Sequence, residues 1–141
     1  MSDLLSNPAF KATRFRRVRR DHGSETASDY CELIADLIRT KGEARTVDLA
    51  QSFGVSQATV TKTIQRLKRD GLVTAVPYRS VFLTDAGETL AAQSQEKHHL
   101  MMSLLVKLGV KPEVAEIDAE GMEHHASTDT LEAIRRYLLS D

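Results

Sequence analysis

The sequence has little cysteine and few aromatic residues. Its 141 residues include one cysteine, Cys31, no tryptophan, and an aromatic content of 5%. A single cysteine excludes an intramolecular disulfide and any cysteine-rich zinc finger. We interpret Cys31 as part of a core, because its segment is rich in Leu and Ile and free cysteine is among the most buried residue types.

Long hydrophobic runs are also absent. No apolar stretch approaches the roughly 20 residues that a membrane-spanning helix needs, and the first residues lack the basic segment and apolar run of a secretory signal. Hydrophobic residues at 41% and charged residues at 28% are typical of a globular protein. These features predict a cytoplasmic protein of one ordinary domain or two small ones, without a membrane partner.

The net charge of −1 excludes a strongly basic protein, but the charge is unevenly distributed. Residues 1–22 contain six basic and two acidic side chains, a net of +4, so the rest of the chain carries −5. A basic arm therefore precedes an acidic body. We expect residues 1–24 to be a flexible basic extension.

The spacing of apolar residues predicts a mainly α-helical fold that begins with a winged helix-turn-helix domain. Up to residue 85, helical periodicity gives way to two β-prone runs around the turn-forming Pro77. The expected elements are three helices and two strands, at residues 28–40, 46–53, 56–70, 72–76 and 80–83. Gly54 separates the second helix from the third, and Ser56 is a suitable N-cap for the third. We expect this domain to span residues 25–85.

The second half of the chain predicts helices only. Gly109 ends a long helix that begins near Ala86, and Pro112 opens another helix at its first position. Ser127 caps a last helix that runs to about Leu139. Residues 86–141 are therefore predicted to form an all-helical domain.

The start of the third helix has the residue types of a DNA-reading element. A recognition helix presents short or hydrogen-bonding side chains in its first turn, because these face base edges in the major groove. Gln57 can pair with adenine, Ala58 can contact a thymine methyl, and Lys62 can reach guanine or phosphate. The predicted DNA-binding residues are Ser56, Gln57, Ala58, Thr59, Lys62, Tyr78 and Arg79. The alternative is a protein-interaction module, and the basic side chains of this helix and of the wing argue against it.

Carboxylates gather at helical spacing in two segments. Asp29 and Glu32 are three residues apart, and Glu120, Glu123 and His124 occupy positions i, i+3 and i+4. Each set therefore shares one face of a helix. Taken alone, each fragment could be a solvated helical face, which is the commoner fate of acidic residues.

A third source of ligands is the long helix, which carries His98 and His99. Neighbouring side chains on a helix diverge by about 100°, so only one of the two can point at a given site. Four carboxylates and two imidazoles without a thiolate suit Mn(II) or Fe(II) better than structural Zn(II). Four negative charges would also balance two divalent cations.

Four segments together resemble the manganese-responsive branch of the diphtheria-toxin-repressor family. They are DYCELI at 29–34, GVSQATV at 54–60, YRSVFLT at 78–84 and, as the most specific, DAEGMEHH at 118–125. The resemblance implies a homodimer that binds a palindromic operator, and represses manganese uptake genes, when a binuclear Mn(II) site is filled. The ligands that it implies are Asp29, Glu32, His98, Glu120, Glu123 and His124.

The resemblance also implies a preference for manganese. The iron-responsive branch has sulfur ligands where this chain has Asp29 and Glu123, and oxygen at both positions lowers the advantage of softer metals. Fe(II) is the alternative metal, and an Fe(II)-responsive regulator of the same family is the alternative function. His99 and His125 are expected to support the ligands rather than bind the ion.

Two functions from other classes fit the sequence less well. A di-metal carboxylate enzyme needs open coordination positions in a substrate pocket, for which the chain has little length. A regulator that senses an organic ligand or an oxidant would not need Glu120, Glu123 and His124 on one face. We therefore expect a regulator that is not an enzyme, has no organic cofactor, and uses the metal to fix one half of the chain against the other.

Overall fold

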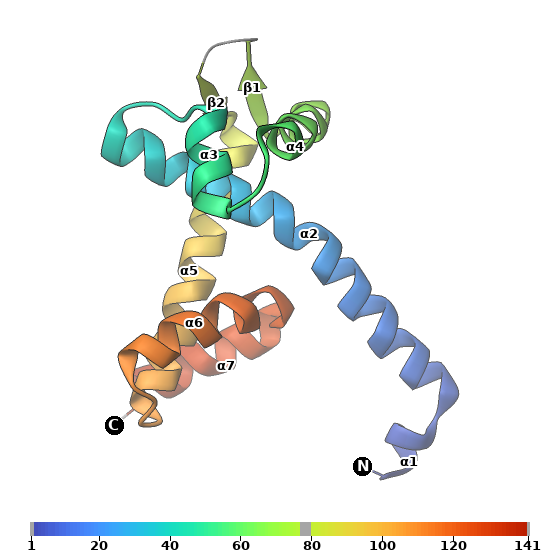
Figure 1. Cartoon of the computed structure of the whole chain (residues 1–141). Coiled ribbons are helices and arrows are strands. Elements are labelled where there is room, and N and C mark those ends of the chain that lie inside the picture. The colour runs from blue at the N-terminus through green and yellow to red at the C-terminus, as the bar shows by residue number, and fades with distance from the viewer. Residues whose placement is uncertain (1, 77–79, 141) are drawn as a thin grey trace. The chain divides into compact units, whose positions relative to one another are not determined.

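The computed structural model describes the backbone of residues 2–76 and 80–140, and the side chains of residues 3–17, 24–76 and 80–140. It divides into two compact units. Residues 27–96 form one of them, which we call the winged-helix unit. The other, which we call the helical unit, combines residues 1–26 with residues 97–141. Two helices, α2 (Pro8–Lys41) and α5 (Asp85–Lys107), which are labelled in Figure 1, contribute residues to both units.

The winged-helix unit has the predicted order of three helices and a hairpin. The end of α2 is followed by the elements α3 (Thr46–Phe53), α4 (Gln57–Arg69), β1 (Val73–Ala75) and β2 (Val81–Leu83). The two strands are antiparallel, with Val73 opposite Leu83 and Ala75 opposite Val81. The predicted fold class is therefore confirmed. The wing residues Tyr78 and Arg79, which we expected to contact DNA, lie outside the described residues.

Local sequence explains the turn between α3 and α4. Gly54 ends α3 with a φ of +68°, a left-handed conformation that favours glycine. Ser56 then caps α4, because its side chain accepts a hydrogen bond from the backbone N–H of Thr59 at 3.1 Å. The turn therefore aims the first residues of α4 away from the core.

The core of the winged-helix unit is apolar. It joins α2, α3, α4 and both strands, through Tyr30, Ile34, Leu37, Ala44, Leu49, Ala50, Val60, Ile64, Leu67, Val73 and Val81. The rings of Tyr30 and Phe53 stack at a centroid distance of 4.5 Å. Burial of these side chains holds α2, α3 and α4 around one core.

A close backbone contact fixes the start of α5 against the turn after α4. The Thr84 hydroxyl donates to the carbonyl of Gly71 at 2.6 Å and accepts from the backbone N–H of Gly87 at 3.2 Å. A Cβ atom at Gly87 would lie 2.1 Å from the carbonyl oxygen of Leu72. Glycine is therefore required at this position.

The helical unit packs the C-terminal helices around a second apolar core. This unit contains the N-terminal part of α2 and the C-terminal part of α5. Its other elements are α1 (Ser2–Ser6), α6 (Pro112–Met122), the short 3-10 helix η1 (Glu123–His125) and α7 (Thr128–Leu139). The core consists of Leu100, Met101, Leu105, Ala115, Ala119, Leu131 and Ile134. None of the described helices contains an apolar stretch of the length that a membrane span needs.

The predicted start of the first long helix was wrong. We expected it at residue 28, with Ser28 as the N-cap, whereas α2 begins at Pro8. The oxygen Oδ1 of Asn7 accepts a hydrogen bond from the backbone N–H of Ala9 at 2.8 Å and so caps the helix. Proline is favoured at a first helical position, and no other proline interrupts the sequence up to Lys41.

Candidate metal centre and DNA-reading helix

The geometry of the candidate metal centre begins with His98 on α5. Its Nδ1 lies 2.7 Å from Oε2 of Glu123 and 3.4 Å from Oε2 of Glu120. Its Nε2 lies 2.9 Å from Oε1 of Glu116. One donor atom each from His98, Glu120 and Glu123 lies within 4.8 Å of the other two. These atoms could coordinate one ion together.

Glu123 is the most buried acidic side chain of this group. Its side chain is 1% exposed, and its Oε1 accepts no hydrogen bond within the described part of the chain. Burial and the nearby negative charge of Glu120 raise the pKa of Glu123 from its ordinary value of 4.5 to about 7. A buried carboxylate oxygen without a hydrogen-bond partner is costly unless a cation completes its environment.

The two nitrogens of His98 face different acids. Burial by itself lowers the pKa of His98, but the hydrogen bond to Glu116 and the negative charge of Glu123 outweigh it, and the net pKa is raised. An imidazole can bind a metal through Nδ1 while its Nε2–H donates to a carboxylate, which orients the ring. Glu116 has that position, and sequence reasoning missed it. Its spacing of four residues from Glu120 was the signal that could have found it. His99, in contrast, is exposed.

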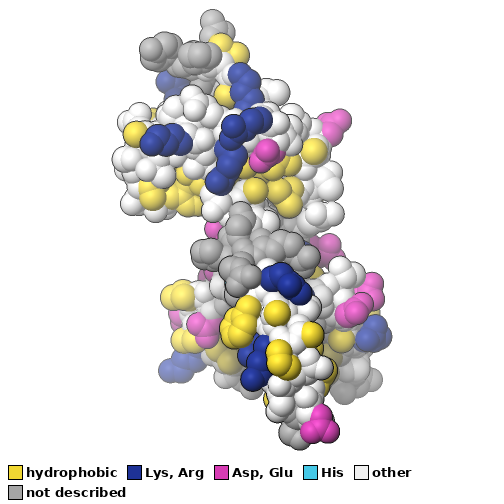
Figure 2. Space-filling model, turned by 90° about the vertical axis from the view of Figure 1, so that its right-hand side faces the viewer, with side chains coloured by type: hydrophobic (Ala, Val, Ile, Leu, Met, Phe, Trp, Pro, Cys, Tyr) yellow, Lys and Arg dark blue, Asp and Glu magenta, His cyan; other side chains and the backbone are white. Residues whose placement is uncertain are grey.

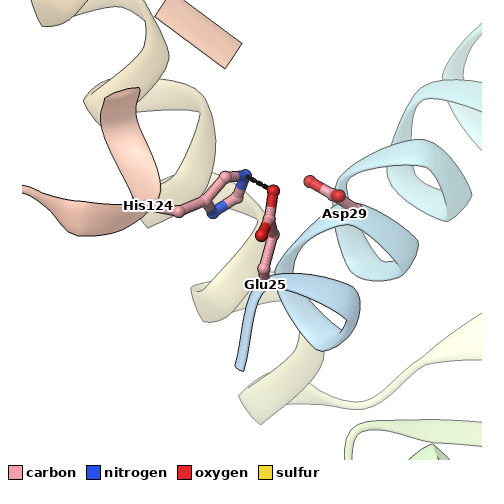
Figure 3. A group of neighbouring side chains, drawn as sticks. All are labelled: Glu25, Asp29 and His124. Atoms are coloured by element: carbon pink, nitrogen blue, oxygen red, sulfur yellow. Dashed lines mark ion pairs between the residues drawn. The ribbon is translucent and has the colours of Figure 1, made fainter. Parts of the chain in front are cut away.

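His124 lies on the other side of the same carboxylates. Its side chain is 6% exposed, and its Nε2 lies 3.6 Å from Oε1 of Glu123 and 3.9 Å from Oε1 of Glu120. Figure 3 shows a further acid, Glu25 of α2, whose Oε1 lies 3.9 Å from the same nitrogen. Sequence reasoning missed Glu25 because the helix was predicted to begin after it.

Asp29 and Glu32 lie on α2 within the winged-helix unit. Both are half-buried, and Oε2 of Glu32 accepts a hydrogen bond from Oγ of Ser94 on α5 at 2.8 Å. Four of the six predicted ligands, His98, Glu120, Glu123 and His124, are therefore brought together in the helical unit, and the other two belong to the winged-helix unit.

The predicted recognition helix presents an exposed polar surface. Gln57, Ala58 and Lys62 are exposed on α4. Ser56 and Thr59 are also exposed, but their hydroxyl oxygens lie 3.0 Å apart and are occupied in capping the helix. Gln57, Ala58 and Lys62 are therefore the exposed side chains of this group that take no part in capping the helix.

Basic side chains continue along the recognition helix. The last turn of α4 contains Arg66, Lys68 and Arg69. Figure 2 shows Lys and Arg side chains gathered in a stripe on the face over α4. The ammonium group of Lys68 donates to the carbonyl of Ala75 at 3.1 Å, which ties α4 to the wing. This surface has the charge that a phosphate backbone requires.

Comparison with known proteins defines the class of protein. The model of the iron dependent repressor N-terminal DNA binding domain matches residues 22–81, and that of the iron dependent repressor metal binding and dimerisation domain matches residues 84–140. The chain belongs to the iron dependent repressor family. It is thus a transcriptional regulator with a DNA-binding and a metal-binding, dimerising part, and the prediction that it is not an enzyme is confirmed.

Relatives of the chain include transcriptional regulators named MntR. The chain is 54% identical over 123 residues to the transcriptional regulator MntR of Escherichia coli O157:H7, which covers 87% of this chain and 79% of that protein. It is 39% identical over 106 residues to the HTH-type transcriptional regulator MntR of Listeria monocytogenes serotype 4b (strain F2365), with 75% of each chain covered. The sequence resemblance to the manganese-responsive branch is therefore confirmed.

Solved structures share the fold. A manganese-dependent transcriptional repressor in complex with manganese is 31% identical, with a TM-score of 0.73, covering 79% of this chain and 52% of that one. The manganese regulator SloR is 25% identical, with a TM-score of 0.70, covering 79% of this chain and 53% of that one. This chain spans about half the length of both solved chains.

Proposed function

We propose that this chain is a Mn(II)-dependent DNA-binding transcriptional repressor that acts as a homodimer on a palindromic operator in the cytoplasm. The observation that carries the proposal is Glu123, a fully buried carboxylate with one oxygen that accepts no hydrogen bond within the described residues. It lies among imidazoles and acids in the part of the chain that matches a metal-binding domain. Two solved structures of similar fold, a manganese-dependent transcriptional repressor and the manganese regulator SloR, support the same metal.

The proposed ligands fit a hard or borderline divalent ion. They are Asp29, Glu32, His98, Glu120, Glu123 and His124. All six offer carboxylate oxygen or imidazole nitrogen and none offers a thiolate, which favours Mn(II) or Fe(II) over structural Zn(II). Four carboxylates balance the charge of two divalent ions, so we propose two per subunit. When bound, the ions neutralise acids that otherwise repel one another.

The proposed switch depends on which domains supply the ligands. We propose a DNA-binding domain at residues 25–85 and a metal-binding, dimerising domain at residues 86–141. Asp29 and Glu32 come from the first, and the other four ligands come from the second. Metal binding would then lock one domain against the other, and without metal the mutual repulsion of the acids would loosen them.

The locked dimer would place two recognition helices on one operator. In a symmetric dimer, their separation matches half-sites about 34–36 Å apart, one turn of DNA, or a multiple of it. We propose that Gln57, Ala58 and Lys62 read base edges, with Ser56 beside them at the groove. Thr59 would contact phosphate, and Tyr78 and Arg79 would contact DNA from the wing.

Fe(II) is the second candidate metal, because the matching family models describe iron dependent repressors. DNA fragments that bind the Mn(II)-loaded protein are first selected from a random pool. Binding of the metal-free protein to these fragments is then measured as Mn(II), Fe(II) or Zn(II) is added, and in the presence of a chelator. We expect Mn(II) to stimulate binding at the lowest concentration. A stronger response to Fe(II) would support the iron alternative, and equal binding in chelator would refute metal dependence.

Two substitutions at Glu123 test the ligand assignment. Glu123→Ala should abolish the Mn(II) response while the dimer stays folded, since the centre would then lack its most buried carboxylate ligand. Glu123→Cys should gain response to Fe(II) and later transition metals relative to Mn(II), because a thiolate favours softer ions. Glu132→Ala, at an exposed acid on α7, is the matched control. A wild-type Mn(II) response in both Glu123 variants would refute the site.

A further inference from the structure

The N-terminal part of α2 carries an acid that approaches the candidate metal centre. Oε1 of Glu25 lies 3.9 Å from Nε2 of His124, and the Glu25 side chain is 27% exposed (Figure 3). Both residues belong to the helical unit. Asp29, the third side chain drawn in Figure 3, belongs to the winged-helix unit. Nothing in the resemblance to known regulators assigns a role to Glu25.

Three carboxylates surround one imidazole nitrogen. Oxygens of Glu25 and Glu120 lie 3.9 Å from Nε2 of His124, and Oε1 of Glu123 lies 3.6 Å away. All three distances exceed a normal N–H···O hydrogen bond of about 2.7–3.2 Å. Ligand atoms about 2.0–2.6 Å from a divalent ion lie roughly 3–4 Å from one another. Each of the three distances is therefore compatible with His124 and that acid binding one ion.

A buried, unsatisfied oxygen supports this arrangement independently. Oε1 of Glu123, which is one of the three, is buried and accepts no hydrogen bond among the residues described. An ion beside it would satisfy this oxygen and screen the three acids from one another. Octahedral coordination dominated by oxygen is typical of Mn(II), and a further carboxylate helps to complete it.

The same helix makes a second contact with this segment. The guanidinium of Arg17 donates a hydrogen bond to the backbone carbonyl of His125 at 3.4 Å, next to His124. Glu25 and Arg17 thus connect the basic N-terminal part of α2 to η1 at two points. A ligand bond at Glu25 would strengthen this connection whenever metal is present.

We infer that Glu25 is a further ligand of the ion held by His124, and that it couples the basic N-terminal helix, residues 8–24, to metal binding. The inference rests on the proposed function, because it needs the chain to bind Mn(II). A ligand and a simple ion-pair partner would have opposite effects on the affinity for Mn(II). As a ligand, Glu25 strengthens Mn(II) binding, whereas an acid that only pairs with protonated His124 competes with the metal and weakens it.

Direct Mn(II) binding to Glu25→Gln tests the inference without DNA. The EPR signal of unbound Mn(II) gives the affinity of the full-length chain, and we expect about tenfold weaker binding of one ion, as when a metal site loses a supporting group. Asp36→Asn makes the same charge change on the exposed surface of α2 and should match the wild type. Circular dichroism of the metal-free variants verifies the fold.

Hydrogen exchange tests the coupling of the helix. Saturating Mn(II) should slow exchange of residues 8–24 in the wild type and in Asp36→Asn, and slow it less in Glu25→Gln. Unchanged or tighter Mn(II) binding by Glu25→Gln, in a chain whose wild type binds Mn(II), would overturn the inference and leave the proposed function intact. A wild type that binds no Mn(II) would overturn both.

Discussion

The two units of the chain satisfy their buried polar side chains differently. Among the described residues, each unit buries one polar side chain, Ser94 in the winged-helix unit and Glu123 in the helical unit. Ser94 donates a hydrogen bond to Glu32 at 2.8 Å. One oxygen of Glu123 accepts none within the described residues. The buried serine of the winged-helix unit is thus hydrogen-bonded within its own unit, whereas the buried acid of the helical unit has an oxygen whose environment an ion would complete.

We expect the buried carboxyl group of Glu123 to lower the stability of the metal-free chain and to mark a functional site. An apolar side chain at position 123 would pack in the same space without the cost of burying a carboxyl group. Ionisable groups with strongly shifted pKa values are concentrated at functional sites. We therefore expect changes in the winged-helix unit to follow ordinary packing, and changes at Glu123 to depend on pH and on metal.

The largest effect is expected from packing in the winged-helix unit. Gly87→Ala places a Cβ atom 2.1 Å from the backbone oxygen of Leu72, and should lower the free energy of unfolding by about 3 kcal/mol or more. Gly121→Ala, in α6, meets nothing within 4 Å and should raise it by up to about 1 kcal/mol. Urea unfolding measures both. Equal effects would show that the close approach at Gly87 does not constrain the fold.

Glu123→Gln should reveal the cost of the buried acid in metal-free protein. The folded-state pKa of Glu123, raised to about 7 by burial and by Glu120, means that the folded chain binds the proton more tightly than the unfolded chain. Wild-type stability should therefore fall as pH rises from about 4.5 to about 7, by roughly 1–3 kcal/mol relative to Glu123→Gln.

Urea unfolding at pH 5 and pH 8 with a chelator measures this difference. The variant should be more stable than the wild type at pH 8, and this advantage should shrink at pH 5. Saturating Mn(II) at pH 8 should remove it by stabilising the wild type. The same difference at both pH values would show that Glu123 does not titrate differently in the folded state, and would weaken the contrast between the units.

Substitutions on the recognition helix should separate DNA reading from metal binding. Lys62→Ala and Gln57→Ala should each weaken binding to the selected operator by about 1–3 kcal/mol if they read bases. Mn(II) affinity should stay unchanged, because both side chains are exposed on α4 and none of the proposed metal ligands lies on that helix. Gel shifts with operator and random DNA measure the effect. An equal loss of affinity for both DNAs would assign these residues to phosphate.

The smallest effect is expected from the basic arm. Lys11, Arg14 and Arg16 are exposed on α2, and their replacement by glutamine leaves the Arg17 hydrogen bond in place. If they neutralise phosphates, the slope of log affinity against log salt should decrease in magnitude by about 0.9 for each phosphate that is no longer neutralised. Filter binding at several salt concentrations measures the slope. An unchanged slope would mean that the arm is only solvated and that DNA binding belongs to the winged-helix unit.

Sequence reasoning was most successful where structure depends on near neighbours. Gly54, the Ser56 cap and the apolar spacing of α4 act within one or two helical turns, so the helix-turn-helix was predictable. The spacing of Glu120, Glu123 and His124 likewise indicated a shared site. The start of α2 was missed because Ser28 has the residue type of a cap, although the helix has its cap at Asn7.

The sequence by itself therefore determined the helices apart from the start of α2, the caps of α4 and α7, the winged-helix order and the residue types of the metal centre. The family resemblance had already favoured His98 over His99. Only the tertiary structure decided that Glu116 lies against the second nitrogen of His98 and that Glu25 approaches His124. Helical periodicity specifies which side chains share a face. Contacts between segments far apart in the chain depend on how helices pack, which no local pattern encodes.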